Sequence, residues 1–162
     1  METESYQEQL AELQRQEEEI QFTRFSNAEA LEIGMRLVEE VKRTGKAITV
    51  DITRNGQCLF HHAMDGTSSN NADWIRRKNN VVRRFGISSY RFGTGLRSQG
   101  KRLEDNPAIP IIDYAPNGGA FPLIIRGVGV IGSVTVSGLP EKDDHELVVR
   151  VLRAYLEQHP HN

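Results

Sequence analysis

Apolar and polar residues alternate along residues 46–64, KAITVDITRNGQCLFHHAM, and this pattern predicts β-strands. Ile48, Val50 and Ile52 lie two residues apart, which is the spacing of a strand with one buried face. Asn55-Gly56 is a typical two-residue turn between paired strands. The segment therefore predicts a β-hairpin.

A second alternating segment, GGAFPLIIRGVGVIGSVTVSG at residues 118–138, predicts another hairpin with a glycine-rich turn. Gly127, Gly129 and Gly132 indicate a bulge or a close approach of another backbone. These three glycines also have the GxGxxG spacing of dinucleotide-binding loops. The segment precedes or enters a strand and does not open a helix, so it does not predict such a loop.

Apolar residues at helical spacing predict helices in much of the remaining chain. Residues 6–20 form a polar helix with a narrow apolar stripe, so this helix needs a partner surface to hold it. Amphipathic helices are also predicted over residues 69–85 and 140–159. A short helix and then a loop rich in Gly and Pro are expected between residues 88 and 110.

The helix predicted after residue 26 has recognisable ends. Ser26 is the expected N-cap, with Glu29 completing a capping box, and Gly45 is a natural stop. Its inward face is predicted from four apolar residues at helical spacing, which are Leu31, Met35, Val38 and Val41.

Trp74 is the single tryptophan of the chain and lies in the helix predicted for residues 69–85. Val81 and Phe85 share its stripe at helical spacing. We expect Trp74 to be at least half buried, against the sheet or at a subunit boundary. In a core position, Trp74→Ala would cost about 3–5 kcal/mol of stability.

Length and composition limit the class of protein. A chain of 162 residues with 38% apolar and 26% charged residues is expected to form one globular domain with its own core. No apolar run approaches the roughly 20 residues that a membrane span requires. The acidic N-terminal segment does not resemble a signal peptide, and the single cysteine cannot form an internal disulfide, so we expect a cytoplasmic protein.

The net charge of −2 hides an uneven distribution. Seven glutamates lie within the first nineteen residues, whereas residues 74–103 contain no acid and nine of the twenty basic residues. A basic surface of this kind would attract carboxylates or phosphates, but a solvated face offset by the acidic segment is an equal alternative. The acidic chain carries no recognised nucleic-acid motif, which argues against nucleic-acid binding.

Several residues of catalytic type have simpler structural interpretations. Cys58 lies in the middle of a predicted strand, away from any helix N-terminus, which favours an inert core thiol. Ser88-Ser89 has no nearby base in the sequence to activate it. Asp143-Asp144 and His145 resemble a metal cluster, but acids at a helix start more simply complement the helix dipole.

The turn GTSSNN at residues 66–71 precedes a predicted helix and is a candidate anion site. Free N–H groups at a helix start point toward any anion held there. Ser and Asn are also the usual capping residues, so an ordinary capped turn is the alternative. The candidate contacts, which lie in the turn or on the following helix, are Thr67, Ser68, Asn71, Trp74, Arg77 and Lys78.

Two motifs resemble the haem-degrading-domain family. One is the C-terminal run GVGVIGSVTVSG with PEKDDHELV, preceded by GGAFPL. The longer one, GQCLFHHAMDGTSSNNADWIRRKNNVVRRFGISSY, is similar to the pattern of a short cytosolic branch of that family. The resemblance covers residues 26–155, and the middle motif is the specific part.

The resemblance implies an α+β fold with a profilin-like α/β/α sandwich, in which a central antiparallel sheet is flanked by helices. The two hairpins and the helices around them agree with this fold. The expected domains are an acidic N-terminal helical extension at residues 1–24 and a single haem-degrading-like domain at residues 25–162. The family also implies a homo-oligomer.

The resemblance implies a haem- or tetrapyrrole-binding protein with a pocket near residues 59–78. If the protein is an enzyme that degrades haem, iron and peroxide would supply the chemistry. The alternative is a non-catalytic homo-oligomeric module that binds a small anion or a protein partner.

His61 and His62 are the residues on which the haem hypothesis depends. Neighbours in a strand point to opposite faces, so these two histidines are poorly placed to share one ion. A single axial ligand to haem iron needs only one imidazole, and His61 is the candidate because it matches the histidine of the branch motif. A structural role in the core or on the surface is the alternative. We expect His61 and the turn at residues 66–71 to border one pocket, with Arg77 and Lys78 as better anion contacts than Arg76.

Overall fold

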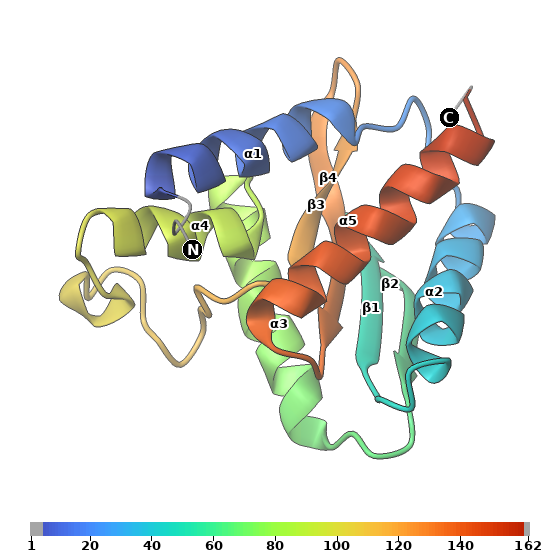
Figure 1. The fold of residues 1–162 in the computed structure, drawn as a ribbon, viewed down its shortest axis with the longest axis horizontal. Coiled ribbons are helices and arrows are strands. Elements are labelled where there is room, and N and C mark those ends of the chain that lie inside the picture. The colour runs from blue at the N-terminus through green and yellow to red at the C-terminus, as the bar shows by residue number, and fades with distance from the viewer. Residues whose placement is uncertain (1–4, 161–162) are drawn as a thin grey trace.

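The structure, a computed structural model, describes residues 5–160 and has a four-stranded antiparallel sheet at its centre (Figure 1). The strand order across the sheet is β2-β1-β4-β3. The strands form two hairpins, as predicted, and their bounds are β1 Thr49–Arg54, β2 Gln57–Ala63, β3 Ala120–Ile125 and β4 Gly129–Ser137.

Helices cover both faces of the sheet. α2 and α5 pack on one face, and α3 packs on the other (Figure 1). The helices, with one 3₁₀ turn, are α1 Tyr6–Glu19, α2 Asn27–Lys42, α3 Ser69–Phe85, α4 Ser89–Ser98, η1 Leu103–Asp105 and α5 Glu141–Gln158. The α+β class and the α/β/α sandwich are confirmed. Within residues 5–160, no helix is long and apolar enough to cross a bilayer.

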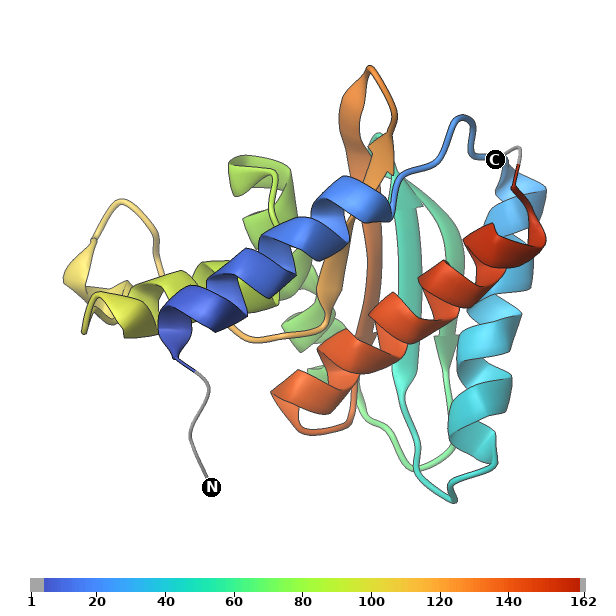
Figure 2. The same ribbon diagram turned by 45° about the horizontal axis from the view of Figure 1, so that its top comes forward.

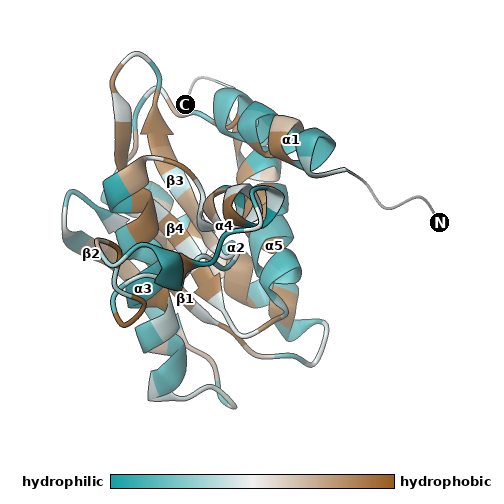
Figure 3. Cartoon of the chain, turned by 90° about the vertical axis from the view of Figure 1, so that its left-hand side faces the viewer, coloured by the Kyte–Doolittle hydropathy of each residue, from teal (hydrophilic) through white to brown (hydrophobic). Residues whose placement is uncertain are grey.

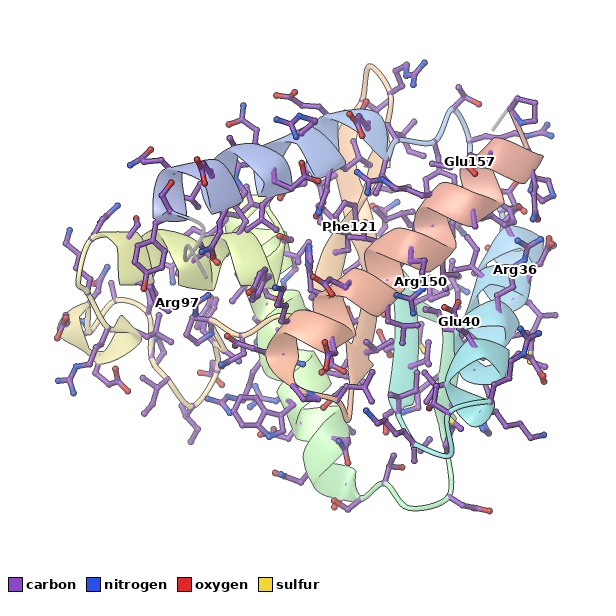
Figure 4. All side chains as sticks on the ribbon, in the orientation of Figure 1. Arg36, Glu40, Arg97, Phe121, Arg150 and Glu157 are labelled. Carbon is purple, nitrogen blue, oxygen red and sulfur yellow. The ribbon has the colours of Figure 1, made fainter. Side chains whose placement is uncertain are left out.

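The core lies between the sheet and the pair α2 and α5. It contains an alternating set of side chains from β1, β3 and β4, such as Val50, Ile52 and Val134, together with the inner faces of both helices. Phe121 lies among them behind α5, whereas Arg150 and Glu40 pair on the surface between α5 and α2 (Figure 4). Figure 3 shows the resulting separation, with mostly apolar strands and mostly polar outer helix surfaces.

The β1–β2 hairpin contains an irregularity that later positions the site. Asn55 and Gly56 have φ of 49° and 82°, as a tight turn between two strands requires. Thr53 pairs with Cys58, but Ile52 pairs with Phe60, so the register shifts by one residue. This is the two-against-one arrangement of a β-bulge, and Leu59 is the extra residue.

The inward face of α2 differs from the prediction. Leu31 and Met35 are 57% and 47% exposed, whereas Val41 is buried as predicted. The rest of the buried face is Ala30, Ile33, Gly34 and Leu37. A Cβ atom at Gly34 would lie 2.4 Å from the Phe60 ring, so the absence of a side chain lets α2 approach β2 on that side. The helix has two apolar stripes, and this close approach selects the second one.

The polar α1 docks alongside α4, at the edge of the molecule away from α2 (Figure 2). The Glu17 carboxylate accepts hydrogen bonds from the Ser88 backbone N–H at 3.2 Å and from Arg91 at 2.9 Å. Burial raises the pKa of Glu17 despite both donors. Farther along, Ile20, Phe22 and Phe25 join the main core cluster. The domain boundary at residues 24 and 25 stays a prediction.

The β3 edge of the sheet is partly covered. The Phe22 N–H donates to Ile124 O at 2.8 Å, and the Arg126 N–H donates to Phe22 O at the same distance. At the other end of β3, the Ala120 N–H donates to Ser89 Oγ. Pro122 removes a further backbone donor from this strand.

Gly132 of β4 confirms the predicted close approach of another backbone. A Cβ atom there would lie 1.9 Å from Thr53 O, which leaves no room for any side chain. Gly127, in the turn between β3 and β4, and Gly129, the first residue of β4, have φ of 77° and 118°. These backbone angles favour glycine at both positions.

Candidate functional site

The face of the sheet toward α3 is polar. Because strand side chains alternate, the residues between the core positions of β1 and β4 point to the opposite face. Asp51 and Thr53 of β1 and Thr135 of β4 lie there, and Asn79 of α3 contacts this group. α3 therefore covers a hydrogen-bonding surface on the sheet, next to its own buried residues Ile75, Val81 and Val82.

Asp51 is the centre of this polar surface and is only 8% exposed. Its Oδ1 accepts hydrogen bonds from Thr53 Oγ1 at 2.7 Å and from Asn79 Nδ2 at 3.2 Å. Thr135 Oγ1 in turn donates to Asn79 Oδ1 at 2.5 Å, which fixes the amide. The carboxylate is thus held from one side by Thr53 and Asn79, and Thr135 holds Asn79 in place.

The other carboxylate oxygen faces β2. His61 Nδ1 lies 3.0 Å from Asp51 Oδ2, and the ring nitrogen donates because an ionised carboxylate only accepts. His61 pairs with Asp51 and His62 pairs with Val50, so the two histidines point to opposite faces, as predicted. The His61 side chain is 42% exposed, and its Nε2 has no hydrogen-bond partner among residues 5–160.

His61 and Asp51 lie at one side of a cavity of about 750 Å³ between the sheet and α3. Ligand sites of proteins commonly have volumes of about 300–1,000 Å³. The wall includes apolar residues of α3 and β4 and two arginines, which are Ile75, Val82, Val130, Ile131, Arg76 and Arg83. The cavity thus combines one imidazole, an apolar wall and two cations.

The two arginines of the cavity differ in their charge partners. Arg76 pairs with Asp73 at 3.1 Å and with Asp113 at 3.0 Å, so its charge is already balanced. Arg83 donates to the neutral Asn80 amide, and in the described part of the chain it forms no ion pair. Arg83 is therefore the cation of this cavity that is available to an anionic ligand.

The other predicted site residues lie elsewhere. Asn71, Trp74 and Lys78 line a second cavity, of about 310 Å³, on the far side of α3 from His61. The structure does not bring His61 and these residues together in one pocket, and Arg76, not Arg77 or Lys78, shares the larger cavity with His61. Helical rotation is the reason, because α3 presents Arg76 and Asn79 to one side and Trp74 and Lys78 to the other.

The GTSSNN turn is mostly occupied by its own capping contacts. Ser68 Oγ accepts from the Asn70 N–H, and Asn71 Oδ1 accepts from the Ser68 N–H, which together form a capping box. Thr67 Oγ1 donates to Met64 O at 2.7 Å. Neither Thr67 nor Ser68 lines a cavity described above, and the Asn71 amide donates to Ser137 Oγ.

Arg77 and Trp74 form a unit on the surface of α3. The Arg77 guanidinium lies 4.7 Å from the centre of the Trp74 ring and donates to the Ile111 carbonyl. Trp74 is of intermediate exposure, which agrees with the expected partial burial. These contacts tie the loop that follows η1 to α3.

Lys78 is buried and has an internal counterion. Its Nζ lies 3.2 Å from Asp144 Oδ2 and 3.2 Å from the Val136 carbonyl oxygen. Burial lowers the pKa of Lys78, and burial raises the pKa of Asp144 to about 6. The neighbouring His145 contacts Gln16 through Nε2, so Asp144 and His145 have separate partners.

Cys58 is exposed at the surface, so the prediction of a core thiol was wrong in its placement. Cys58 pairs with Thr53, so its side chain lies on the face that carries Asp51 and not on the core face, and β2 lies at the sheet edge. Partial burial and the Asp51 carboxylate raise the pKa of the thiol. A raised pKa disfavours the thiolate, so Cys58 is not an activated nucleophile.

Sequence reasoning missed three residues of the site, which are Asp51, Asn79 and Arg83. Asp51 was visible as an acid between two core residues, Val50 and Ile52, which is an unusual place for a charge. Its partners were not visible, because an unbulged hairpin would pair Asp51 with Phe60. Arg83 was only one of nine basic residues, and the sequence does not show that Arg76 pairs with the distant Asp113 whereas Arg83 contacts the neutral Asn80.

Comparison with known proteins identifies the family. The model of the family "Haem degrading protein HbpS-like" matches residues 25–153. A UPF0303 protein of Burkholderia ambifaria is 47% identical over 143 residues, which cover 88% of this chain and 87% of the relative.

Two solved structures extend the comparison. The crystal structure of the Ybr137w protein superposes with a TM-score of 0.86 at 30% identity, covering 93% of this chain and 88% of that one. The crystal structure of a PduOC:heme complex superposes with a TM-score of 0.68 at 15% identity, covering 80% and 94%, and shows the same fold. The chain therefore belongs to the HbpS-like family of haem-degrading proteins.

Proposed function

We propose that this protein binds haem in the 750 Å³ cavity between the sheet and α3, with His61 as the ligand to iron. The observation that carries the proposal is the hydrogen bond from His61 Nδ1 to Asp51 Oδ2 at 3.0 Å, beside this cavity. A metal-binding histidine usually donates its other ring N–H to a carboxylate, which fixes the ring and raises its basicity.

The residues of the cavity fit the chemical groups of haem. The imidazole can bind iron through Nε2, which has no partner within the described residues. Ile75, Val82 and Val130 offer an apolar wall to the ring. Arg83, which has no carboxylate partner among residues 5–160, would hold a propionate by a charge-assisted hydrogen bond.

Family membership supports the same ligand class. The family model is described as haem degrading, and one structure of the same fold is titled as a haem complex. Bound haem would supply the iron chemistry of any degradation reaction. The protein's own residues would bind the ring, orient it through His61 and Asp51, and neutralise its carboxylates.

The alternative is a non-catalytic module that binds a small anion in the same cavity. Arg83 and His61 both line that cavity, so a carboxylate without a tetrapyrrole ring would find two of the contacts proposed for haem. Haem binding and small-anion binding can be told apart by the iron, because only haem binding requires a bond between iron and His61 Nε2.

A haemin titration tests the proposal. Addition of haemin to the full chain should shift the Soret band, and His61→Ala should weaken binding and abolish the spectrum of histidine-ligated iron. His62→Ala is the matched control, because this neighbouring imidazole lies on the opposite face. Arg83→Gln should lower affinity and leave the ligation spectrum unchanged.

The proposal fails if the wild-type protein gives no Soret shift, or if His61→Ala and His62→Ala bind haemin equally. Calorimetry with acetate and phosphate then tests the alternative. Anion binding that is lost in Arg83→Gln, in a protein without a Soret shift, would identify the small-anion module.

A further inference from the structure

We propose that Asp51, Cys58 and His61 form a binding site for a transition-metal ion of the zinc type, separate from haem iron. One ligand atom from each of these residues lies within 4.8 Å of the other two. Oδ2 of Asp51 is 3.8 Å from Sγ of Cys58 and 3.0 Å from Nδ1 of His61. Thiolate, imidazole and carboxylate are the ligands that Zn²⁺ uses in proteins. The inference goes beyond the proposed haem function and does not depend on it.

The distances fit a tetrahedral ion. Bond lengths of about 2.0–2.3 Å to a tetrahedral Zn²⁺ place neighbouring ligand atoms about 3.3–3.6 Å apart. In the structure, Nδ1 of His61 is 3.0 Å and Sγ of Cys58 is 3.8 Å from Asp51 Oδ2. Both distances are within a few tenths of an ångström of that spacing. The ligand atoms of Cys58 and His61 lie within 4.8 Å of each other, and rotation of these two exposed side chains would bring them to a common ion.

The bulge in β2 makes this arrangement possible. Cys58 and His61 are three residues apart, and in a regular strand they would point to opposite faces. The one-residue shift at Leu59 brings both side chains to the face that carries Asp51. Bulges often redirect a side chain next to a functional site, so the irregularity is a second observation in favour of the site.

The carboxylate is already oriented for ligation. Both hydrogen bonds from Thr53 and Asn79 end on Asp51 Oδ1, and Oδ2 is left for His61 and Cys58. Such outer contacts are usual around metal sites, where they fix the ligand and maintain affinity. At 8% exposure, Asp51 is a nearly buried acid held in one position.

Three protein ligands would leave one coordination position of a tetrahedral ion open. Asp51 and His61 also line the 750 Å³ cavity, so a water or a small ligand could reach that position. Zinc sites with three protein ligands and one open position are the catalytic type, whereas structural sites are closed.

Binding of the ion releases one proton. The Cys58 thiol loses its proton to solvent as the sulfur–metal bond forms. The His61 proton moves from Nδ1 to Nε2, so that Nδ1 can donate its lone pair to the ion. Nε2 then carries a proton, and His61 cannot bind haem iron at the same time.

Cobalt titration of the reduced full chain tests the site. Co²⁺ should give intense visible bands typical of tetrahedral coordination and a near-ultraviolet band typical of a thiolate–cobalt bond, and Zn²⁺ should displace both. Cys58→Ser should remove the thiolate band. Asp51→Asn and His61→Ala should each weaken binding more than about tenfold, since loss of an outer contact alone costs about 10–100-fold.

His62→Ala is the matched control and should bind Co²⁺ like the wild type. Circular dichroism of each variant distinguishes loss of a ligand from loss of the fold. Absence of a thiolate band, or equal affinity in His61→Ala and His62→Ala, would overturn the proposal. The haem proposal is tested separately, because Cys58→Ser should retain haemin binding and Arg83→Gln should retain Co²⁺ binding.

Discussion

Lys78 of α3 and Asp144 of α5 form an ion pair across the end of the sheet, with side-chain exposures of 4% and 2%. The pair joins two helices on opposite faces of the sheet. Asp144 Oδ1 also accepts from the Leu139 N–H at 3.0 Å, which fixes the start of α5. The Lys78 amine, which was predicted to contact an anionic ligand, is thus paired with a carboxylate of the protein itself.

Lys78→Met should destabilise the protein by about 3–5 kcal/mol, because it leaves the Asp144 charge buried and unpaired. Urea unfolding measures this cost. The double variant Lys78→Met/Asp144→Asn should recover most of it, since the asparagine can still accept from Leu139. A single variant as stable as the wild type would contradict the buried pair, and an unchanged haemin affinity would separate Lys78 from the haem cavity.

His145 should make the protein sensitive to acid. Burial lowers its pKa from 6.5 to about 4, and Nε2 lies 2.7 Å from Gln16 Oε1. Between pH 6.5 and pH 4 the unfolded chain binds a proton that the folded chain excludes. Wild-type stability should therefore fall by about 3 kcal/mol relative to His145→Gln over this range.

Asp144 acts in the opposite direction, because its raised pKa of about 6 favours the folded state at low pH. Its contribution is present in both proteins and cancels in the comparison. Urea unfolding at several pH values measures the difference. If the stability difference between wild type and His145→Gln does not change with pH, His145 has the same pKa in the folded and the unfolded state.

Trp74→Ala should cost about 1–2 kcal/mol, less than the 3–5 kcal/mol of a fully buried aromatic residue. Trp74 is only partly buried and packs against the Arg77 guanidinium. Trp74→Phe should retain most of the stability, since a ring remains for the cation. A loss above 3 kcal/mol would indicate that the ring is covered in the protein as it exists in solution.

Zinc and haem should compete for His61. Saturating Zn²⁺ should reduce haemin affinity to the level of His61→Ala, because zinc at Nδ1 leaves a proton on Nε2. Soret titrations with and without zinc measure this effect. In Cys58→Ser, zinc should no longer reduce haemin affinity. If the wild type binds zinc and haemin fully at the same time, the two ligands use different residues.

The protein should form a homo-oligomer through the exposed apolar face of α2. Leu31 and Met35 are 57% and 47% exposed on that face. Leu31→Lys/Met35→Lys should reduce the mass measured by light scattering at micromolar concentration. Val128→Lys is a control at the β3–β4 turn, where the residue is 74% exposed. A monomeric wild type would contradict the prediction.

Local signals in the sequence predicted most of the fold. Asn55-Gly56 encodes its own turn, and Ser26 marks a helix start because its side chain accepts from the Glu29 N–H three residues away. The choice between the two apolar stripes of α2 was not local. It depended on the contact between Gly34 and Phe60, which are far apart in the sequence.

The site was harder to predict than the fold for the same reason. His61 could be chosen from its motif and its place on a strand. Its partner Asp51 could not, because one extra residue in β2 decides which side chain lies opposite. Helical spacing did separate Arg76 from Trp74 and Lys78, but only the packed sheet shows which side of α3 faces the larger cavity.

The partial cover on β3 has a consequence for assembly. Phe22, Ser89 and Pro122 leave few free backbone groups on that side, whereas the outer edge of β2 has no strand beside it in residues 5–160. Two copies of the protein that pair through sheet edges can therefore use only the β2 edge. Such a contact is two-fold and closes with the second copy, so this geometry disfavours fibrous growth.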